Sequence, residues 1–92
     1  MYGTIRRYRV KDPKTFSQKV NAEFINIVRK IPGFVSYHAI DEGNGNWASV
    51  SLFTTADGIT RSDQLAAEWV ARACPDLVSG PPEITKGPVS VK

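Results

Sequence analysis

The chain has 92 residues, of which 41% are hydrophobic and 23% are charged, and its formal net charge is +3. This length suits a single domain over residues 1–92, and no apolar run approaches the roughly 20 residues that cross a bilayer. Basic residues are mixed with acidic ones, so no run of about five or six like charges marks a nucleic-acid-binding tail. The composition predicts a soluble globular protein that binds neither nucleic acid nor membrane.

The cysteine content and the absence of known short motifs indicate where the protein is located and which cofactors it lacks. Cys74 is the only cysteine, so an internal disulfide is excluded and a reducing cytoplasm is the expected location. Charge interrupts the segment from Met1 to Arg7 before an apolar core forms, which is not the pattern of a signal peptide. The sequence has no metal-ligand spacing, phosphate-binding glycine loop or dinucleotide fingerprint. We therefore expect no metal and no nucleotide cofactor.

The first predicted elements are a strand and a helix. Residues 2–10 are rich in β-branched and aromatic side chains, which favours a strand. Asp12 and Pro13 then suit a helix cap and a first helical turn. Apolar side chains recur at steps of three and four along one helix face, at Phe16, Val20, Phe24, Ile27, Val28 and Ile31. Pro32-Gly33 ends this helix.

A hairpin follows the first helix. Residues 34–41 and 47–54 are predicted strands, and Gly43-Asn44-Gly45-Asn46 between them favours a tight turn because these residues tolerate positive φ. Large apolar side chains occur at both the odd and the even positions of the two strands. Both faces of the sheet are therefore apolar and need to be covered. Two helices cover one face. We expect a second copy of the chain to cover the other, the alternative being a monomer with a partly apolar outer face.

A second helix and a last strand complete the chain. Thr55 or Asp57 caps a helix that extends to about Ala73. The last strand, over residues 83–91, contains Pro88, which confines that part of it to an edge or a bulge. The order β-α-β-β-α-β predicts an α+β, ferredoxin-like domain, in which a four-stranded antiparallel sheet carries both helices on one face.

Three short segments together carry a resemblance to a known family. Pro32-Gly33-Phe34 closes the first helix and opens the second strand, and Val10-Lys11 ends the first strand before a proline and a helix. In these segments the chain resembles the antibiotic biosynthesis monooxygenase-like superfamily, and residues 80–85 look like a small uncharacterised subgroup of it. The resemblance covers essentially the whole chain. It implies a homodimer whose two sheets close a dimeric α/β barrel, with a cavity between sheet and helices.

Members of that superfamily include cofactor-independent oxygenases, haem-degrading enzymes and proteins without known activity, so the fold does not fix the chemistry. The haem-degrading branch uses an asparagine on the first strand, then a tryptophan and a haem-ligating histidine in the second helical region. Aligned on Val10, the asparagine position here holds Arg6, Trp69 does not match the family spacing, and no histidine follows His38. The axial ligand is missing, so we expect neither haem nor another cofactor.

Arg6 and His38 are the candidate catalytic residues. Val10 precedes the turn into the first helix, so alternation along its strand places Arg6 and Tyr8 on the helix side of the sheet. Phe34, packed under that helix, places Ser36 and His38 there too. Arg6 would then bind an anionic oxygen while His38 accepts or donates a proton. A slip of one residue in register reverses either assignment.

Each candidate has a structural alternative. Arg6 either binds a ligand, or forms an ion pair with Glu23 or Glu68, or reaches water at the mouth of a pocket. His38 is either a base or a strand histidine bonded to a neighbouring serine. The candidate substrate-binding residues are Tyr8, Ser36, Ser51 and Trp69. Trp69, at helical spacing, also suits a position in the core.

Two functions remain open at this point. The first is a cofactor-independent monooxygenase-like enzyme acting on a small hydrophobic phenolic or carbonyl compound, which supplies the electrons once it is deprotonated. The second is a non-catalytic dimer that holds a small molecule or serves in a stress response. The sequence supports a cavity with hydrogen-bond donors better than it supports a reaction.

Overall fold

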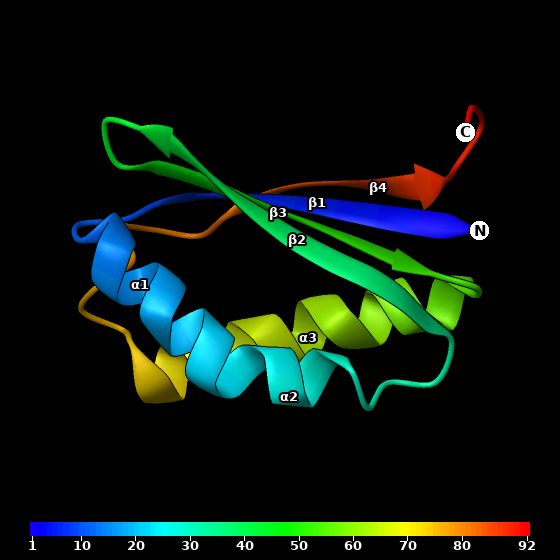
Figure 1. The fold of residues 1–92 in the computed structure, drawn as a ribbon, viewed down its shortest axis with the longest axis horizontal. Helices are drawn as coiled ribbons and strands as arrows, with labels where there is room; N and C mark the ends of the chain where they lie inside the picture. The colour runs from blue at the N-terminus through cyan, green and yellow to red at the C-terminus, as the bar shows by residue number, and fades with distance from the viewer.

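A four-stranded antiparallel sheet carries all of the helices on one of its faces (Figure 1). The computed structural model describes all 92 residues. Its strands are β1 (Tyr2–Arg9), β2 (Phe34–Gly43), β3 (Asn46–Phe53) and β4 (Glu83–Pro88). Their order across the sheet is β2-β3-β1-β4, so β1 and β3 are central and β4, with Pro88 at its end, is an edge strand. The predicted α+β, ferredoxin-like fold is confirmed.

The helical segment between β1 and β2 is not one regular helix. It consists of α1 (Pro13–Lys19), the π-helical turn η1 (Val20–Phe24) and α2 (Ile25–Val28). Asp12 caps α1, as predicted, by accepting a hydrogen bond from the backbone N–H of Thr15 at 3.1 Å. Within η1, the N–H of Ile25 donates to the carbonyl of Val20, five residues earlier.

The wider turn has a cause in the spacing of the apolar residues. Phe16, Val20, Phe24 and Val28 are buried and lie four residues apart. In a regular α-helix each step of four turns the side chain about 40° past a full turn, so three steps rotate it by about 120°. The π-helical turn absorbs part of this rotation and keeps all four side chains on the sheet.

The second helical segment is the single helix α3 (Ala56–Ala73). Of the two predicted caps, Thr55 is the one observed, and its hydroxyl accepts from the backbone N–H of Gly58 at 3.1 Å. The buried residues of α3 recur at steps of three and four and pack on the sheet: Gly58, Ile59, Ser62, Ala66 and Trp69. None of the helices has the length and hydropathy needed to cross a membrane.

Gly58 allows α3 to approach β3 closely. A Cβ at this position would lie 2.8–2.9 Å from side-chain atoms of the fully buried Phe53. We expect Gly58→Ala to lower the free energy of unfolding by up to about 2 kcal/mol, because an overpacking cost of about 1–3 kcal/mol exceeds the ~1 kcal/mol by which alanine favours a helix. Gly87→Ala, with no atom within 4 Å of the added Cβ, is the control for a denaturant titration. Equal losses in the two variants would contradict this account of the packing.

The register of β2 corrects one expectation from the sequence. A β-bulge between Phe34 and Ser36 shifts the pairing with β3 by one residue. Phe34 packs against the core as expected, but Tyr37 is paired with the fully buried Ser51 and therefore faces the helices. Ser36 and His38 consequently face away from the helices, opposite to their predicted orientation. The alternation fails because a bulge moves every following side chain to the other face.

The sheet face opposite the helices carries apolar side chains from three strands. They are Ile5 on β1, Ile40 on β2, and Ala48, Val50 and Leu52 on β3. Ile40 is 56% exposed, so this face is open to solvent in the single chain. We refer to this surface as the open face. Its composition agrees with the two-sided apolar pattern of the strands.

Candidate functional site

A small cavity lies between the sheet and the helices. Ten residues line it, nine of them hydrophobic, and the exception is Arg6. Aromatic side chains form much of the wall, among them Tyr8, Phe24, Tyr37, Trp47 and Trp69. The cavity volume is about 10 Å³, which is room for about one water-sized molecule. A larger occupant therefore requires these side chains to move apart.

Arg6 is buried on the central strand β1 in spite of its charge. It is 1% exposed, and its Nη1 donates to Oδ1 of Asp63 on α3 at 2.8 Å. Asp63 also accepts from the hydroxyl of Thr4 at 3.0 Å. The ion pair weighed as the alternative for Arg6 is thus present, but its partner is Asp63 rather than Glu23 or Glu68.

Three polar atoms near Arg6 are buried without a hydrogen-bond partner. They are Nε of Arg6 and the hydroxyl oxygens of Ser49 and Ser51. Arg6 and Ser49 are paired directly across β1 and β3, and Ser51 is the next residue of β3 on the same face. Buried polar groups in folded proteins are normally hydrogen-bonded. Of the three residues only Arg6 lines the cavity, so its guanidinium is the group that a polar atom of a ligand could reach.

Tyr8 and Tyr37 line the cavity beside the guanidinium. Burial raises the pKa of both hydroxyls above the ordinary value, although the nearby charge of Arg6 acts in the opposite direction. Burial also opposes the charge of Arg6, but the two tyrosines and Asp63 outweigh it and raise the pKa of the guanidinium. At neutral pH the guanidinium is therefore charged and the two tyrosine hydroxyls are neutral, and all three groups can donate hydrogen bonds.

The raised pKa values of Tyr8 and Tyr37 predict a loss of stability in alkaline solution. The folded protein holds these protons to higher pH than the unfolded chain, whose tyrosines titrate at about 10. The stability that the two protonated tyrosines contribute is therefore present below about pH 10. It is lost as the pH rises through their pKa values in the folded protein. We expect the free energy of unfolding to fall above about pH 10, and to fall less steeply in the Tyr8→Phe/Tyr37→Phe double variant. Denaturant titrations at several pH values measure this dependence. If the free energy of unfolding falls equally steeply with pH in both proteins, the pKa values of the two tyrosines are not raised.

The structure separates the residues that the sequence analysis selected. Arg6, Tyr8 and Trp69 line the cavity, and Ser51 is buried on the same face of the sheet. His38 is exposed and is paired with Val50 on the open face, and it borders a surface groove outside the cavity, between η1 and β2.

The predicted joint site of Arg6 and His38 is therefore wrong, because the two side chains lie on opposite faces of the sheet. The same holds for the predicted position of Ser36 beside the cavity. Both errors come from the β-bulge at the start of β2.

Two residues of the site were missed in the sequence. Asp63 directly follows the buried Ser62 and lies three residues before the buried Ala66, so it lies near the sheet, but helical spacing does not single it out as the partner of Arg6. Tyr37 was missed because a strictly alternating strand would have put it on the open face. No feature of the local sequence marks the β-bulge that turns it inward.

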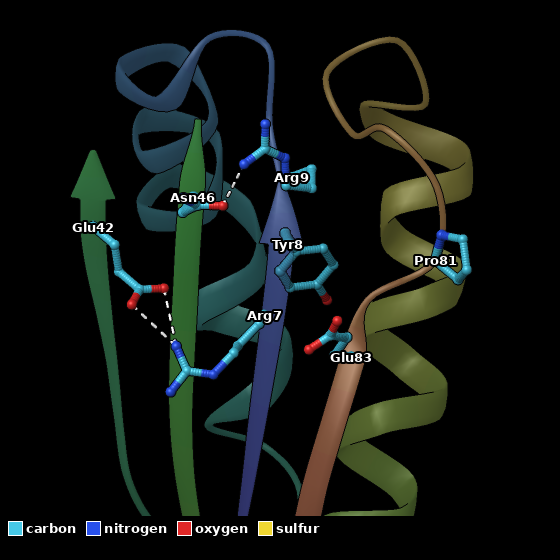
Figure 2. A pocket seen from close by; sticks show the side chains of 7 residues that line it. All are labelled: Arg7, Tyr8, Arg9, Glu42, Asn46, Pro81 and Glu83. Atoms are coloured by element: carbon cyan, nitrogen blue, oxygen red, sulfur yellow. Dashed lines mark hydrogen bonds and ion pairs between the residues drawn. The ribbon is translucent and has the colours of Figure 1, made fainter. Parts of the chain in front are cut away.

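A polar pocket of about 270 Å³ lies at the end of β1, on the open face (Figure 2). Figure 2 shows Arg7 directed at Glu42, to whose carboxylate oxygens it donates at 3.0 and 3.1 Å. Arg9 donates to Oδ1 of Asn46 at 2.6 Å. These pairs are exposed, and exposed pairs contribute little stability. Because its arginines are paired and exposed to water, whereas Nε of Arg6 is buried without a partner, this pocket is a weaker candidate for ligand binding than the cavity at Arg6.

Several solved structures share this fold, whereas no protein-family model and no curated protein sequence matches the chain significantly. SnoaB, a cofactor-independent oxygenase from Streptomyces nogalater, is 19% identical, with a TM-score of 0.76 over 99% of this chain and 94% of that chain. The monooxygenase ActVA-Orf6 of Streptomyces coelicolor, in complex with nanaomycin D, is 16% identical, with a TM-score of 0.75 over 99% and 89%.

A third structure with this fold holds a different kind of ligand. MhuD, with two manganese protoporphyrin IX molecules bound per active site, is 13% identical, with a TM-score of 0.73 over 100% of this chain and 97% of that chain. The resemblance to antibiotic biosynthesis monooxygenase-like proteins is thus confirmed at the level of the fold. Because the same fold holds chemically different ligands, the residues of the cavity must indicate the chemistry.

Proposed function

We propose that this chain is a cofactor-independent monooxygenase of the antibiotic biosynthesis monooxygenase-like superfamily, acting on a small hydrophobic phenolic compound. The observation that carries the proposal is Arg6, a buried guanidinium whose Nε has no partner and which is the one charged residue lining an aromatic cavity. Aromatic walls suit a flat apolar ring, and a few polar groups that converge on one point suit its oxygen.

The charges around Arg6 favour an oxygen that carries negative charge. Asp63 lies 2.8 Å from Arg6, and Nζ of Lys86 lies 3.9 Å from the same carboxylate. Two cations and one carboxylate leave this cluster with a net positive charge. A nearby positive charge stabilises the phenolate over the phenol and lowers the pKa of the bound ligand. The neutral hydroxyls of Tyr8 and Tyr37 can donate to the same oxygen.

A bound phenolate can itself supply the electrons for dioxygen. Overall, one phenol and one dioxygen give one para-quinone and one water. The ring carbon opposite the hydroxyl loses its hydrogen and gains an oxygen, the hydroxyl loses its hydrogen, and the two hydrogens leave in the water. The ring gives up four electrons and dioxygen accepts four, so the balance needs no further reductant. The protein's part is to bind the phenolate, exclude water and hold the ring in place.

Two observations favour the second candidate, a non-catalytic small-molecule-binding dimer. His38, the predicted base, faces away from the cavity. Asp63, the carboxylate next to Arg6, already accepts hydrogen bonds from Thr4 and Arg6. Under this candidate the cavity holds the phenol without converting it.

The proposal extends to the assembly and the location of the protein. The apolar open face supports a homodimer in which two sheets pack against each other. The single cysteine, Cys74, is buried and unpaired, which supports a reducing cytoplasm.

Incubation with 1-naphthol under isotopically labelled dioxygen distinguishes the two candidates. We expect 1,4-naphthoquinone with one labelled oxygen, at a rate that neither added metal nor added flavin raises. Binding of 1-naphthol without product would favour the non-catalytic dimer. A failure to bind naphthols at all would contradict both.

A further inference from the structure

Two surface grooves share walls with the cavity at Arg6. The first, which we call the edge groove, lies between η1 and β2 and has a volume of about 260 Å³. Its walls include Ser17, Val20, Asn21, Tyr37, Ala39 and Trp47. The second, which we call the proline groove, lies between α3 and residues 75–82 and has a volume of about 350 Å³. Its walls include Tyr8, Val70, Ala71, Pro75, Pro81 and Pro82. A ligand could reach the cavity from either side.

The walls of the edge groove are less constrained than those of the proline groove, although the ring N–H of Trp47 donates to the hydroxyl of Ser17 at 2.9 Å and this bond must break for Trp47 to move outward. Val20 and Asn21 belong to the π-helical turn, which holds one more residue than an α-helical turn and can rearrange locally. On the other side β2 is an edge strand, so only one neighbouring strand holds it in place. Val20, Tyr37 and Trp47 line both this groove and the cavity.

The walls of the proline groove are fixed more firmly. Proline locks its own backbone φ, and three prolines lie in this wall. The backbone N–H of Ser79 donates to the carbonyl of Arg9 at 2.8 Å, and the carbonyl of Leu77 accepts from Lys11 at 2.9 Å. These bonds tie residues 75–82 to the end of β1 and oppose an opening on this side.

We propose that the substrate enters through the edge groove and that this groove holds the ring system beyond the ring that reaches Arg6. This inference rests on the function proposed above. The cavity alone, at about 10 Å³, holds no ring, whereas outward movement of Tyr37 and Trp47 joins it to the 260 Å³ of the groove. Drug-sized ligands occupy pockets of about 300–1,000 Å³. The joined space, at about 270 Å³, lies just below that range, so it suits a compound smaller than a drug, such as a phenol of two fused rings. Ala39 and Asn21, on opposite walls, then determine the size of the ligand.

Two matched substitutions test the route. Ala39→Phe fills the edge groove, and Ala71→Phe adds the same side chain to the proline groove; both alanines are exposed. Binding of phenol and of 1-naphthol is followed by the fluorescence of Trp47 and Trp69, which line the cavity. We expect Ala39→Phe to weaken 1-naphthol binding about tenfold or more and to slow its association, with phenol affinity unchanged within about twofold. Ala71→Phe should alter both affinities by less than about twofold.

The outcomes separate this inference from the function on which it rests. If Ala71→Phe weakens 1-naphthol binding and Ala39→Phe does not, the edge groove is not the route, although the proposed function stands. If the unmodified protein binds neither probe, the function and the route fall together. Asn21→Trp, on the opposite wall, must reproduce the effect of Ala39→Phe. The thermal unfolding of each variant shows that binding is measured on folded protein.

Discussion

Arg6→Leu is expected to lower the free energy of unfolding by about 3–5 kcal/mol, because it leaves a buried carboxylate without its charged partner. That carboxylate belongs to Asp63, whose side chain is 10% exposed. In the variant it keeps two interactions, the hydrogen bond from the hydroxyl of Thr4 and the ion pair with Lys86 at 3.9 Å. Asp63→Leu is expected to destabilise by a similar amount, because it leaves the guanidinium unpaired. Denaturant titrations of the two single variants measure both losses.

The double variant Arg6→Leu/Asp63→Leu is the control for this interpretation. Removing both charges leaves no buried ion, so we expect much of the lost stability to return. Naphthol binding should be absent from the double variant even where it is well folded, because the guanidinium is gone. If the losses of the single variants simply add, the two residues are not coupled as the structure indicates.

Val50→Asp is expected to convert the proposed dimer into a monomer of 10.1 kDa. Val50 lies on the open face opposite Ile5, and a carboxylate there would be buried between two apolar sheets without a partner. Gln64→Asp adds the same charge at an exposed position on α3 and should leave the dimer intact. Tyr37→Asp, on the cavity side, should instead reduce the stability of the fold.

Light scattering at micromolar protein concentration measures the mass of each form. A monomeric mass for the unmodified chain would contradict the dimer. A dimeric mass for Val50→Asp would place the interface somewhere other than the open face.

Local chemistry was sufficient to predict the elements and their order. Asp12 and Thr55 are caps because their side chains accept hydrogen bonds from the first turn, an effect that depends on a few neighbouring residues. The turn at residues 43–45 likewise follows from its composition, since Gly43, Asn44 and Gly45 all have positive φ. The placement of Arg6 under the helices was also correct, because β1 has no bulge and strict alternation holds along it.

The site could be predicted only in part, because two irregularities depend on the whole fold. One residue inserted at the start of β2 reverses the direction of His38 and Tyr37, and neither composition nor periodicity reveals such an insertion. The π-helical turn is similar: repeated four-residue spacing favours it, as at Phe16, Val20 and Phe24, but the broad apolar face of a regular helix also accepts this spacing over a few turns. The partner of Arg6 depended on how α3 lies across the sheet, which spacing within α3 does not determine.

A crystal structure of the protein with 1-naphthol tests the central claim most directly, because that claim is a position for one oxygen atom. The account predicts that the naphthol oxygen lies about 3 Å from Nε of Arg6. It also predicts that the second ring lies between η1 and β2, with Tyr37 and Trp47 displaced from their present positions. Naphthol bound elsewhere, for example beside Arg7 and Glu42 on the open face, with Arg6 still without a ligand contact, would contradict it.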